Sequence, residues 1–235
     1  MSLIVTLHVQ EGFVLAADSR VSMHLGKKAE NTVLTGIRHY SDNFQKVFEL
    51  PNHGGISFCG EMATEQGGLH FLLGEFIRRE ISAATPLTNV PQLLLNYFQS
   101  LPTVPATIFH VCGYGGETGG GLFYRVIPKR MLIEDLAERA LIWDGEGDIL
   151  ARILSPVEIK ASSEQGKALP DYPVPLNLFT LQDAVDFADY AVKMTAETMK
   201  FQLRPKTVGG AVDILVLQPG ESRWLRKKTL KLDDE

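Results

Sequence analysis

Cysteines are scarce in this chain, and the sequence has no recognisable metal-binding cluster. Two cysteines occur among its 235 residues, and neither belongs to a C-x-x-C pair or a cysteine–histidine cluster. That spacing predicts no structural metal, and nothing in the sequence calls for a cofactor. Cys59 and Cys112 each end an apolar, strand-like run, so we expect both to be buried free thiols.

Long hydrophobic runs and an excess of positive charge are also absent. No apolar run is long enough to cross a bilayer, and no basic region leads into an apolar stretch and a cleavage site. We therefore expect a cytoplasmic protein without a membrane partner. The net charge of −5 predicts no general affinity for nucleic acid. The glycines at 115–120 lack the Gly-Lys-Ser/Thr ending of a phosphate-binding loop, so we expect a hairpin turn there.

The composition that remains is ordinary for a globular protein, with 45% hydrophobic and 22% charged residues. No repeat or linker divides the chain, so we expect one domain over residues 1–235. Residues 3–10 and 13–18 are predicted to form an antiparallel hairpin. Residues 21–43 read as an extended connection or a long hairpin that crosses the surface. Further strands are predicted at 44–50, 56–59, 106–114, 121–128, 130–134, 138–143, 211–217 and 221–228.

Helical spacing of apolar residues predicts helices at 61–82, 88–100 and 148–154. A longer helix is expected to run to Phe201 from a capping box at Thr180 and Asp183. The order is strands, two helices, strands, helices and strands. This order predicts an α+β protein with two antiparallel sheets and a helical layer outside each, a four-layer αββα sandwich.

Ser2 is the first candidate for chemistry. Its small side chain follows the initiator Met1, so removal of Met1 by an aminopeptidase is expected. The new N-terminus would carry a hydroxyl nucleophile beside an α-amine, which titrates near ~7.7–8.0 and can accept the hydroxyl proton. Taken alone, a serine at position 2 is equally well an ordinary second residue.

Several segments in register point to a family. Gly12 and the run Ala16–Arg20 lie at set distances from Ser2, Lys46 opens a later strand, and Gly60 closes the strand after it. Together with Val208–Asp213, they resemble the proteasome-type peptidases among the N-terminal nucleophile hydrolases, bacterial proteasome homologues included. The resemblance covers most of the chain. Family members open with a threonine where this chain has a serine.

The resemblance implies a catalytic set of Ser2, Asp18, Lys46 and Gly60. Ser2 would attack a carbonyl, and its own amine would carry the proton. Asp18 would hold Lys46 charged, and Lys46 would lower the pKa of the Ser2 amine and hydroxyl. The backbone N–H of Gly60 would face the developing oxyanion, where such a donor is worth about 3–4 kcal/mol.

The surrounding positions depart from the family pattern. Arg20 keeps the family's arginine, whereas Glu146 stands where a family serine approaches the amine. A carboxylate there would either hydrogen-bond the amine or hold it protonated and inactive. The family's Asp-x-x-Ser aligns with Pro205–Val208, where Thr207 could supply a hydroxyl one residue out of register. The connection from Arg20 to Lys46 is also longer than usual.

Three functions remain open at this stage. The first is a serine relative of the threonine peptidases that forms stacked homo-oligomeric rings and cleaves peptides or proteins, with room for a separate ATPase unfoldase. The second is an amidohydrolase of small molecules on the same fold. The third is an inactive ring or scaffold, which a retained Met1 would favour because it removes the free amine.

Overall fold

The computed structural model describes residues 2–29, 32–115, 119–156, 158–159, 167–168, 170 and 172–229. Two five-stranded sheets form its centre, and every strand pair in them is antiparallel. The first sheet has the order β12 (Leu141–Gly145), β1 (Leu3–Val9), β2 (Gly12–Ala17), β15 (Asp213–Gln218) and β16 (Glu221–Arg226). The second has the order β11 (Leu132–Asp135), β10 (Gly121–Ile127), β9 (Thr107–Tyr114), β6 (Gly55–Gly60) and β5 (Val47–Glu49).

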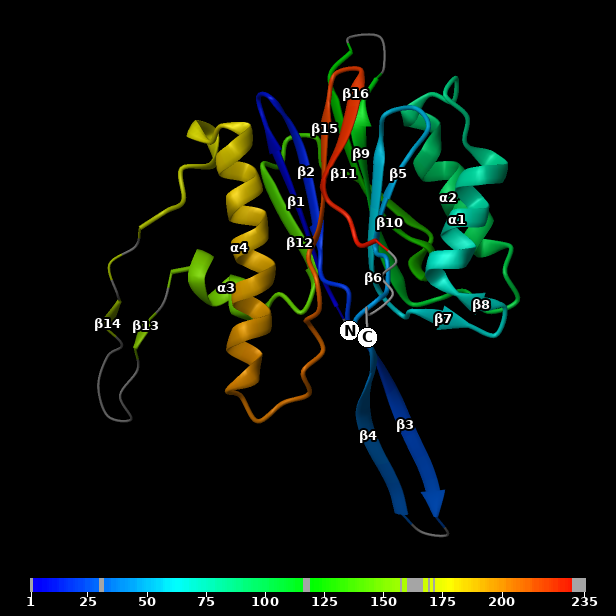
Figure 1. Ribbon diagram of the computed structural model, residues 1–235, viewed down its shortest axis with the longest axis vertical. Coiled ribbons are helices and arrows are strands. Elements are labelled where there is room, and N and C mark those ends of the chain that lie inside the picture. The colour runs from blue at the N-terminus through cyan, green and yellow to red at the C-terminus, as the bar shows by residue number, and fades with distance from the viewer. Residues whose placement is uncertain are drawn as a thin grey trace, which may run out of the picture.

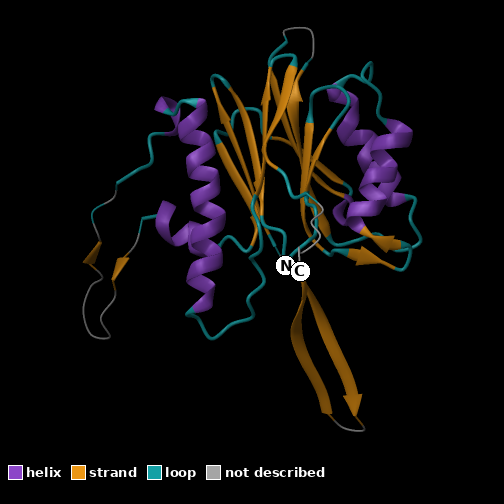
Figure 2. Ribbon diagram, in the orientation of Figure 1, coloured by secondary structure: helices purple, strands orange, loops and turns teal. Residues whose placement is uncertain are grey.

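Helices lie on the outer side of each sheet (Figures 1 and 2). The first sheet is covered by α3 (Asp148–Leu154) and α4 (Leu181–Lys200), and the second by α1 (Leu69–Glu80) and α2 (Val90–Gln99). The expected combination of antiparallel sheets and helices is confirmed. Short 3-10 turns occur at Leu87–Asn89, Pro128–Arg130 and Leu176–Leu178. No helix in the described ranges is both long and apolar enough to span a membrane.

The alternation of side chains along β1 decides which layer each residue joins. Leu3, Val5 and Leu7 pack with α3 and α4, whereas Ile4 packs between the two sheets. Successive strand side chains point to opposite faces, so Ser2 belongs to the face that Ile4 shares. The start of β1 therefore aims Ser2 into the space between the sheets.

The long helix α4 follows the sequence prediction closely. Its capping box is present: the Thr180 hydroxyl accepts from the Asp183 N–H, and the Asp183 carboxylate accepts from the Thr180 N–H. The buried stripe of α4, which contains three alanines, packs on the first sheet. Small residues on this face let the helix approach the sheet closely.

The helix expected at 61–82 is shorter than predicted. Residues 63–68 form a small antiparallel ladder, β7 (Ala63–Thr64) with β8 (Gly67–Gly68), and α1 begins only at Leu69. Two consecutive glycines have low helix propensity, and the N–H of Leu69 bonds the carbonyl of Met62 across the ladder. The apolar spacing of this stretch was therefore no guide to where the helix begins.

The connection after β2 forms a hairpin, β3 (Val21–Ala29) with β4 (Thr32–Ser41). It extends away from both sheets and does not cross their surface (Figure 1). A second small pair, β13 (Glu158–Ile159) with β14 (Lys167–Ala168), lies outside α3. The body of the protein is thus formed by the two sheets and their helices.

Candidate active site

Ser2 lies just before β1, fully buried, at the edge of the space between the sheets. Its carbonyl accepts a hydrogen bond of 2.8 Å from the N–H of Glu146. Its hydroxyl oxygen has no hydrogen-bond partner among the described residues. Buried hydroxyls are usually hydrogen-bonded. An unpartnered hydroxyl is therefore one that a substrate or the chain's own amine could bind.

Asp18 follows β2 and links three distant parts of the chain. Its Oδ1 accepts from the N–H of Leu3 at 3.1 Å, and its Oδ2 accepts from the N–H groups of Arg20 at 3.0 Å and Gly209 at 3.1 Å. Asp18 as a whole residue is 1% exposed. These bonds attach the residue next to Ser2 to the loop that precedes β15.

Lys46 completes the buried cluster. Its Nζ donates to Asp18 Oδ1 at 2.8 Å and to the carbonyl of Arg20 at 2.6 Å, and both charged side chains are 0% exposed. Burial lowers the pKa of Lys46, while the charge and hydrogen bond of Asp18 oppose that effect. Lys46 Nζ and the N–H of Leu3, the residue after Ser2, therefore bond the same oxygen, Asp18 Oδ1.

Gly60 ends β6, paired with Thr107 of β9. Its φ of +116° suits glycine, and a Cβ at this position would lie 2.3 Å from the carbonyl oxygen of Ala106. The neighbouring Cys59 is buried between the sheets, and burial raises the pKa of its thiol well above the ordinary value. Cys59 is therefore neutral near pH 7. The oxyanion role of Gly60 stays a prediction.

The turn after β12 wraps around the main chain of Ser2. Gly145, with φ +97°, has no room for a side chain, because a Cβ there would lie 1.9 Å from the Ser2 oxygen. The carboxylate of Glu146 points to other groups: Arg204 Nη2 at 2.7 Å and the hydroxyl of Thr207 at 2.8 Å. Both groups are hydrogen-bond donors to the Glu146 carboxylate. Arg204 was not among the residues expected from the sequence, although it directly precedes the Pro205–Val208 segment.

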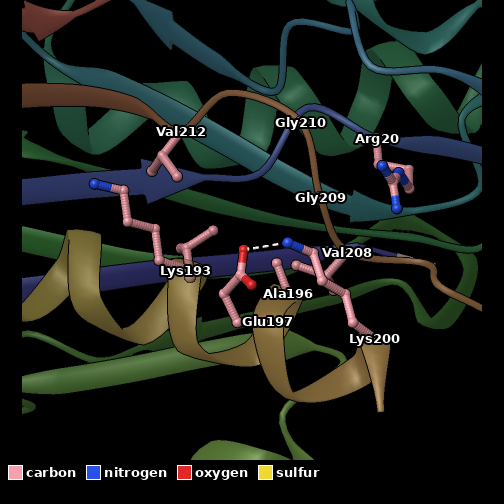
Figure 3. Close-up of a pocket in the computed structure, with 10 residues that line it drawn as sticks. Arg20, Lys193, Ala196, Glu197, Lys200, Val208, Gly209, Gly210 and Val212 are labelled. Carbon is pink, nitrogen blue, oxygen red and sulfur yellow. Dashed lines mark hydrogen bonds and ion pairs between the residues drawn. The ribbon is translucent and has the colours of Figure 1, made fainter. Parts of the chain in front are cut away.

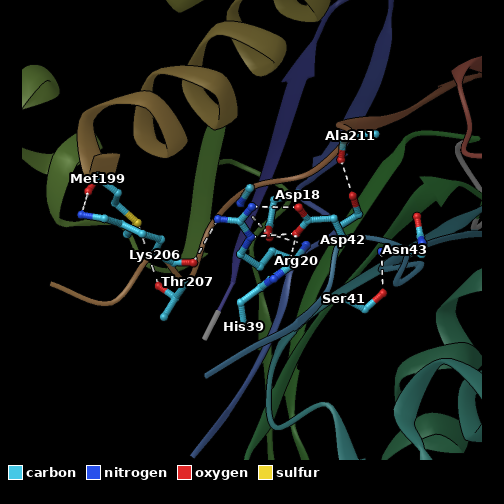
Figure 4. A network of polar contacts seen from close by, with 12 residues as sticks. Asp18, Arg20, His39, Ser41, Asp42, Asn43, Met199, Lys206, Thr207 and Ala211 are labelled. Atoms are coloured by element: carbon cyan, nitrogen blue, oxygen red, sulfur yellow. Dashed lines mark hydrogen bonds and ion pairs between the residues drawn. The ribbon is translucent and has the colours of Figure 1, made fainter. Parts of the chain in front are cut away.

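Arg20 binds a second carboxylate that the sequence did not single out. Its Nε and Nη2 donate to Asp42 at 2.7 and 2.8 Å, and His39 also contacts Asp42, at 3.0 Å (Figure 4). The Arg20 side chain lowers the pKa of Asp42 to about 2. Through this pair Arg20 fixes the base of the β3–β4 hairpin, while its main chain bonds Asp18 and Lys46.

A cavity of about 210 Å³ lies between α4 and the loop before β15 (Figure 3). Arg20 and Gly209, which both bond Asp18, line it together with Lys193 and Lys200 of α4. Ser2 and Lys46 do not line it. The cavity therefore does not include the candidate nucleophile.

A second polar network joins the two sheets. Thr6 contacts His110 Nδ1 at 2.9 Å, and His110 Nε2 contacts Asp144 at 2.8 Å. A carboxylate only accepts, so Nε2 carries the proton and the Thr6 hydroxyl donates to Nδ1. Burial lowers the pKa of His110, and Arg125 donates to Asp144 at 2.8 Å. Since Thr6 and His110 are fully buried, the network holds β12, and hence the turn around Ser2, in place.

The predicted residues thus form two connected groups. Asp18 and Lys46 form a buried ion pair that bonds the amide of Leu3, the residue after Ser2, and Glu146 and Thr207 meet at the turn beside Ser2. In the described part of the chain, no group of three or more His, Cys, Asp or Glu residues could hold a metal ion. The arrangement supplies a hydroxyl, a fixed cation and a set of main-chain donors.

Comparisons with known proteins show the fold. No protein-family profile and no curated protein matches the chain. An Anbu Gly-1 mutant from Hyphomicrobium sp. strain MC1 gives a TM-score of 0.59 at 15% identity, covering 100% of this chain and 89% of that one. Anbu (ancestral beta-subunit) from Yersinia bercovieri gives a TM-score of 0.57 at 15% identity, covering 97% and 88%. The chain therefore has a proteasome-like β-subunit fold, as the sequence resemblance implied.

Proposed function

We propose that this protein is an N-terminal nucleophile hydrolase that cleaves peptide bonds with Ser2 after removal of Met1. The observation that carries the proposal is the buried Asp18–Lys46 pair, hydrogen-bonded to the amide next to Ser2. The free hydroxyl of Ser2 supports it. On this proposal, the single domain over 1–235 is the four-layer αββα sandwich of the N-terminal nucleophile hydrolases.

On this proposal the reaction proceeds through an ester intermediate on Ser2. Ser2 Oγ attacks the peptide carbonyl carbon while the α-amine of Ser2 takes the hydroxyl proton. The Lys46 ammonium lowers the pKa of both groups by its charge, and the Gly60 N–H donates to the oxyanion. The amine then passes its proton to the leaving nitrogen, the C–N bond breaks, and an ester to Ser2 remains. Water, deprotonated by the same amine, hydrolyses that ester and restores the hydroxyl.

We further propose that copies of the chain assemble into stacked rings, so that protein or peptide substrates reach Ser2 inside a shielded chamber. Any ATPase that unfolds substrates would be a separate protein. The substrate class of the proposal rests on the fold. An amidohydrolase of small molecules would use the same Ser2 chemistry and would differ in its substrates and assembly.

One observation favours an inactive ring or scaffold as the second candidate. Ser2 is 0% exposed in the chain that still carries Met1, so a retained Met1 leaves neither a free amine nor a reachable hydroxyl. Removal of Met1 is therefore the step on which activity depends.

The test is the intact mass of the untagged protein before and after treatment with a peptide β-lactone. Loss of Met1 and one adduct mapped to Ser2 are expected. Ser2→Ala still permits Met1 removal and should take up no probe. Ser57→Ala removes another buried hydroxyl without a described partner and should react like the wild type. A retained Met1, or a free Ser2 that takes up no probe, would contradict the peptidase and favour the inactive ring or scaffold.

A further inference from the structure

Building on the proposed function, we propose that Arg204 is a positioning residue: it pairs with Glu146 so that this carboxylate leaves the Ser2 α-amine free to act as the base. The role belongs to a residue that follows α4, far from Ser2 in the sequence. It concerns the protonation of the nucleophile's own amine rather than contact with substrate.

The first step is the closeness of Glu146 to Ser2. The N–H of Glu146 bonds the Ser2 carbonyl at 2.8 Å, and Gly145 contacts the same carbonyl too closely to accept a side chain. Leu3 and Gly145 are also paired across β1 and β12. The turn therefore cannot move away from Ser2 without breaking the sheet edge, and the main chain of Glu146 stays beside Ser2.

The second step concerns the hydrogen bonds of the Glu146 carboxylate. Glu146 is 14% exposed, and each of its oxygens has a donor: Arg204 Nη2 at 2.7 Å and the Thr207 hydroxyl at 2.8 Å. Arg204 also bonds Asp148 at 2.8 Å, and Arg152 lies 3.7 Å from Asp148. Two acids and two arginines balance one another at this turn.

The third step is the balance of charge on the other sides of Ser2. Asp18 is paired with Lys46, and Asp144 is bonded by Arg125 and by His110, which burial keeps neutral. Asp213 accepts from the backbone of Lys228, and Cys59 is a neutral thiol at pH 7. In the described part of the chain, Glu146 has one paired cation, and that cation is Arg204. Loss of Arg204 would leave one uncompensated negative charge next to the amine.

An uncompensated carboxylate stabilises the ammonium form, so it raises the pKa of the amine. A neighbouring opposite charge moves a pKa by about one unit or more, starting from ~7.7–8.0 for an α-amine. The acidic limb is the part of the pH–rate profile in which the rate rises with pH as the amine loses its proton. It should then move to higher pH by about one unit, which lowers the rate at pH 7 about tenfold. Loss of Glu146 with Arg204 retained should move the limb to lower pH.

The experiment measures the rate of β-lactone attachment to Ser2 from pH 5.5 to 9.5. Arg204→Met is expected to shift the acidic limb upward, Glu146→Gln to shift it downward, and the double variant to restore the wild-type position. Arg226→Gln removes an ion pair of 2.6 Å between β16 and Asp189 of α4, and it should leave the limb unmoved. A purely structural role for Arg204 would lower the rate equally at every pH.

The outcomes separate this inference from the proposed function. If the wild type forms no adduct at Ser2, the proposed function is wrong. If the wild type reacts but Arg204→Met and Glu146→Gln leave the limb in place, or shift it in the same direction, the role of Arg204 is overturned. Should Arg204→Met not fold, Glu146→Gln alone decides, since an unmoved limb in that variant contradicts the inference.

Discussion

Lys46→Met measures how strongly the folded state depends on the buried ion pair. The change removes the ammonium and keeps most of the side-chain volume. Asp18, which is 1% exposed, then remains as a buried carboxylate without its cation. Breaking a buried pair from one side costs about 3–5 kcal/mol. Three backbone N–H groups still donate to Asp18, so we expect the lower end of that range.

Asp18→Asn perturbs the same pair from the other side. It leaves the Lys46 side chain fully buried without an anionic partner, and should also cost about 3–5 kcal/mol. In each single variant, most of the loss comes from the charge left behind. The double variant Asp18→Asn/Lys46→Met removes both charges, so its loss should be well below the sum of the two single losses.

Urea unfolding followed by circular dichroism gives the three free energies, and calorimetry gives the shift in Tm. For a chain of this size 1 kcal/mol corresponds to roughly 2–4 °C, so each single variant should melt roughly 6–20 °C lower. The control is Lys193→Met: the Lys193 side chain is 56% exposed, and its i,i+4 helix pair with Asp189 is worth about 0.3–0.5 kcal/mol. If the single losses add up to the double loss within about 0.5 kcal/mol, the two charges are not coupled and the reasoning fails.

Three further predictions concern the surroundings of the pair. Gly145→Ala should lower the free energy of unfolding, measured with urea, by about 1–3 kcal/mol or more, because the new Cβ would lie 1.9 Å from the Ser2 oxygen. Gly74→Ala, a helical position with nothing within 4 Å, should instead be neutral or stabilising; equal effects would contradict the steric argument. Burial lowers the pKa of His110, so the unfolded chain binds a proton below about pH 6.5 while the native state does not. The wild type should therefore lose more stability between pH 7.5 and 5.5 than His110→Gln does, and equal losses would refute a buried neutral imidazole. Finally, the Cys59 thiol, whose pKa burial raises, should resist a thiol reagent at pH 8 until urea unfolds the chain; rapid labelling of the native protein would count against its burial.

The local periodicity of the sequence was sufficient for most of the fold. Two apolar runs on either side of the Glu11–Gly12 turn predicted β1 and β2 to within a residue or two, and the Thr180–Asp183 capping box placed the start of α4 correctly. It failed at residues 61–68, where apolar spacing continued through a glycine pair that starts a β ladder. The spacing of apolar residues indicates which face of an element is buried. It does not indicate where the backbone hydrogen bonds change from a β ladder to a helix.

The residues of the candidate site could be predicted only where they belong to a sequence motif. The resemblance implied Asp18 by its distance from Ser2 and Lys46 by its distance from Gly60, and the structure brings Asp18 and Lys46 into contact. Arg204 and Asp42 were missed because each acts through a partner in another segment: Arg204 is 58 residues from Glu146, and Asp42 is 22 residues from Arg20. Side-chain pairing between distant segments leaves no periodic signal in the sequence.

Asp18 can form all of its hydrogen bonds only after the ribosome has synthesised the late segment that contains Gly209. β2 has β15 as its second neighbour, and Asp18 takes one of its donors from Gly209, which the ribosome adds almost 200 residues later. At about 5–20 residues per second, β2 keeps an open edge for roughly 10–40 s after it is made. A nascent or truncated chain that ends before Gly209 carries Ser2 but cannot complete the cluster around Asp18. On the proposed function, unfinished copies of this hydrolase would therefore be unable to cleave their neighbours on the ribosome.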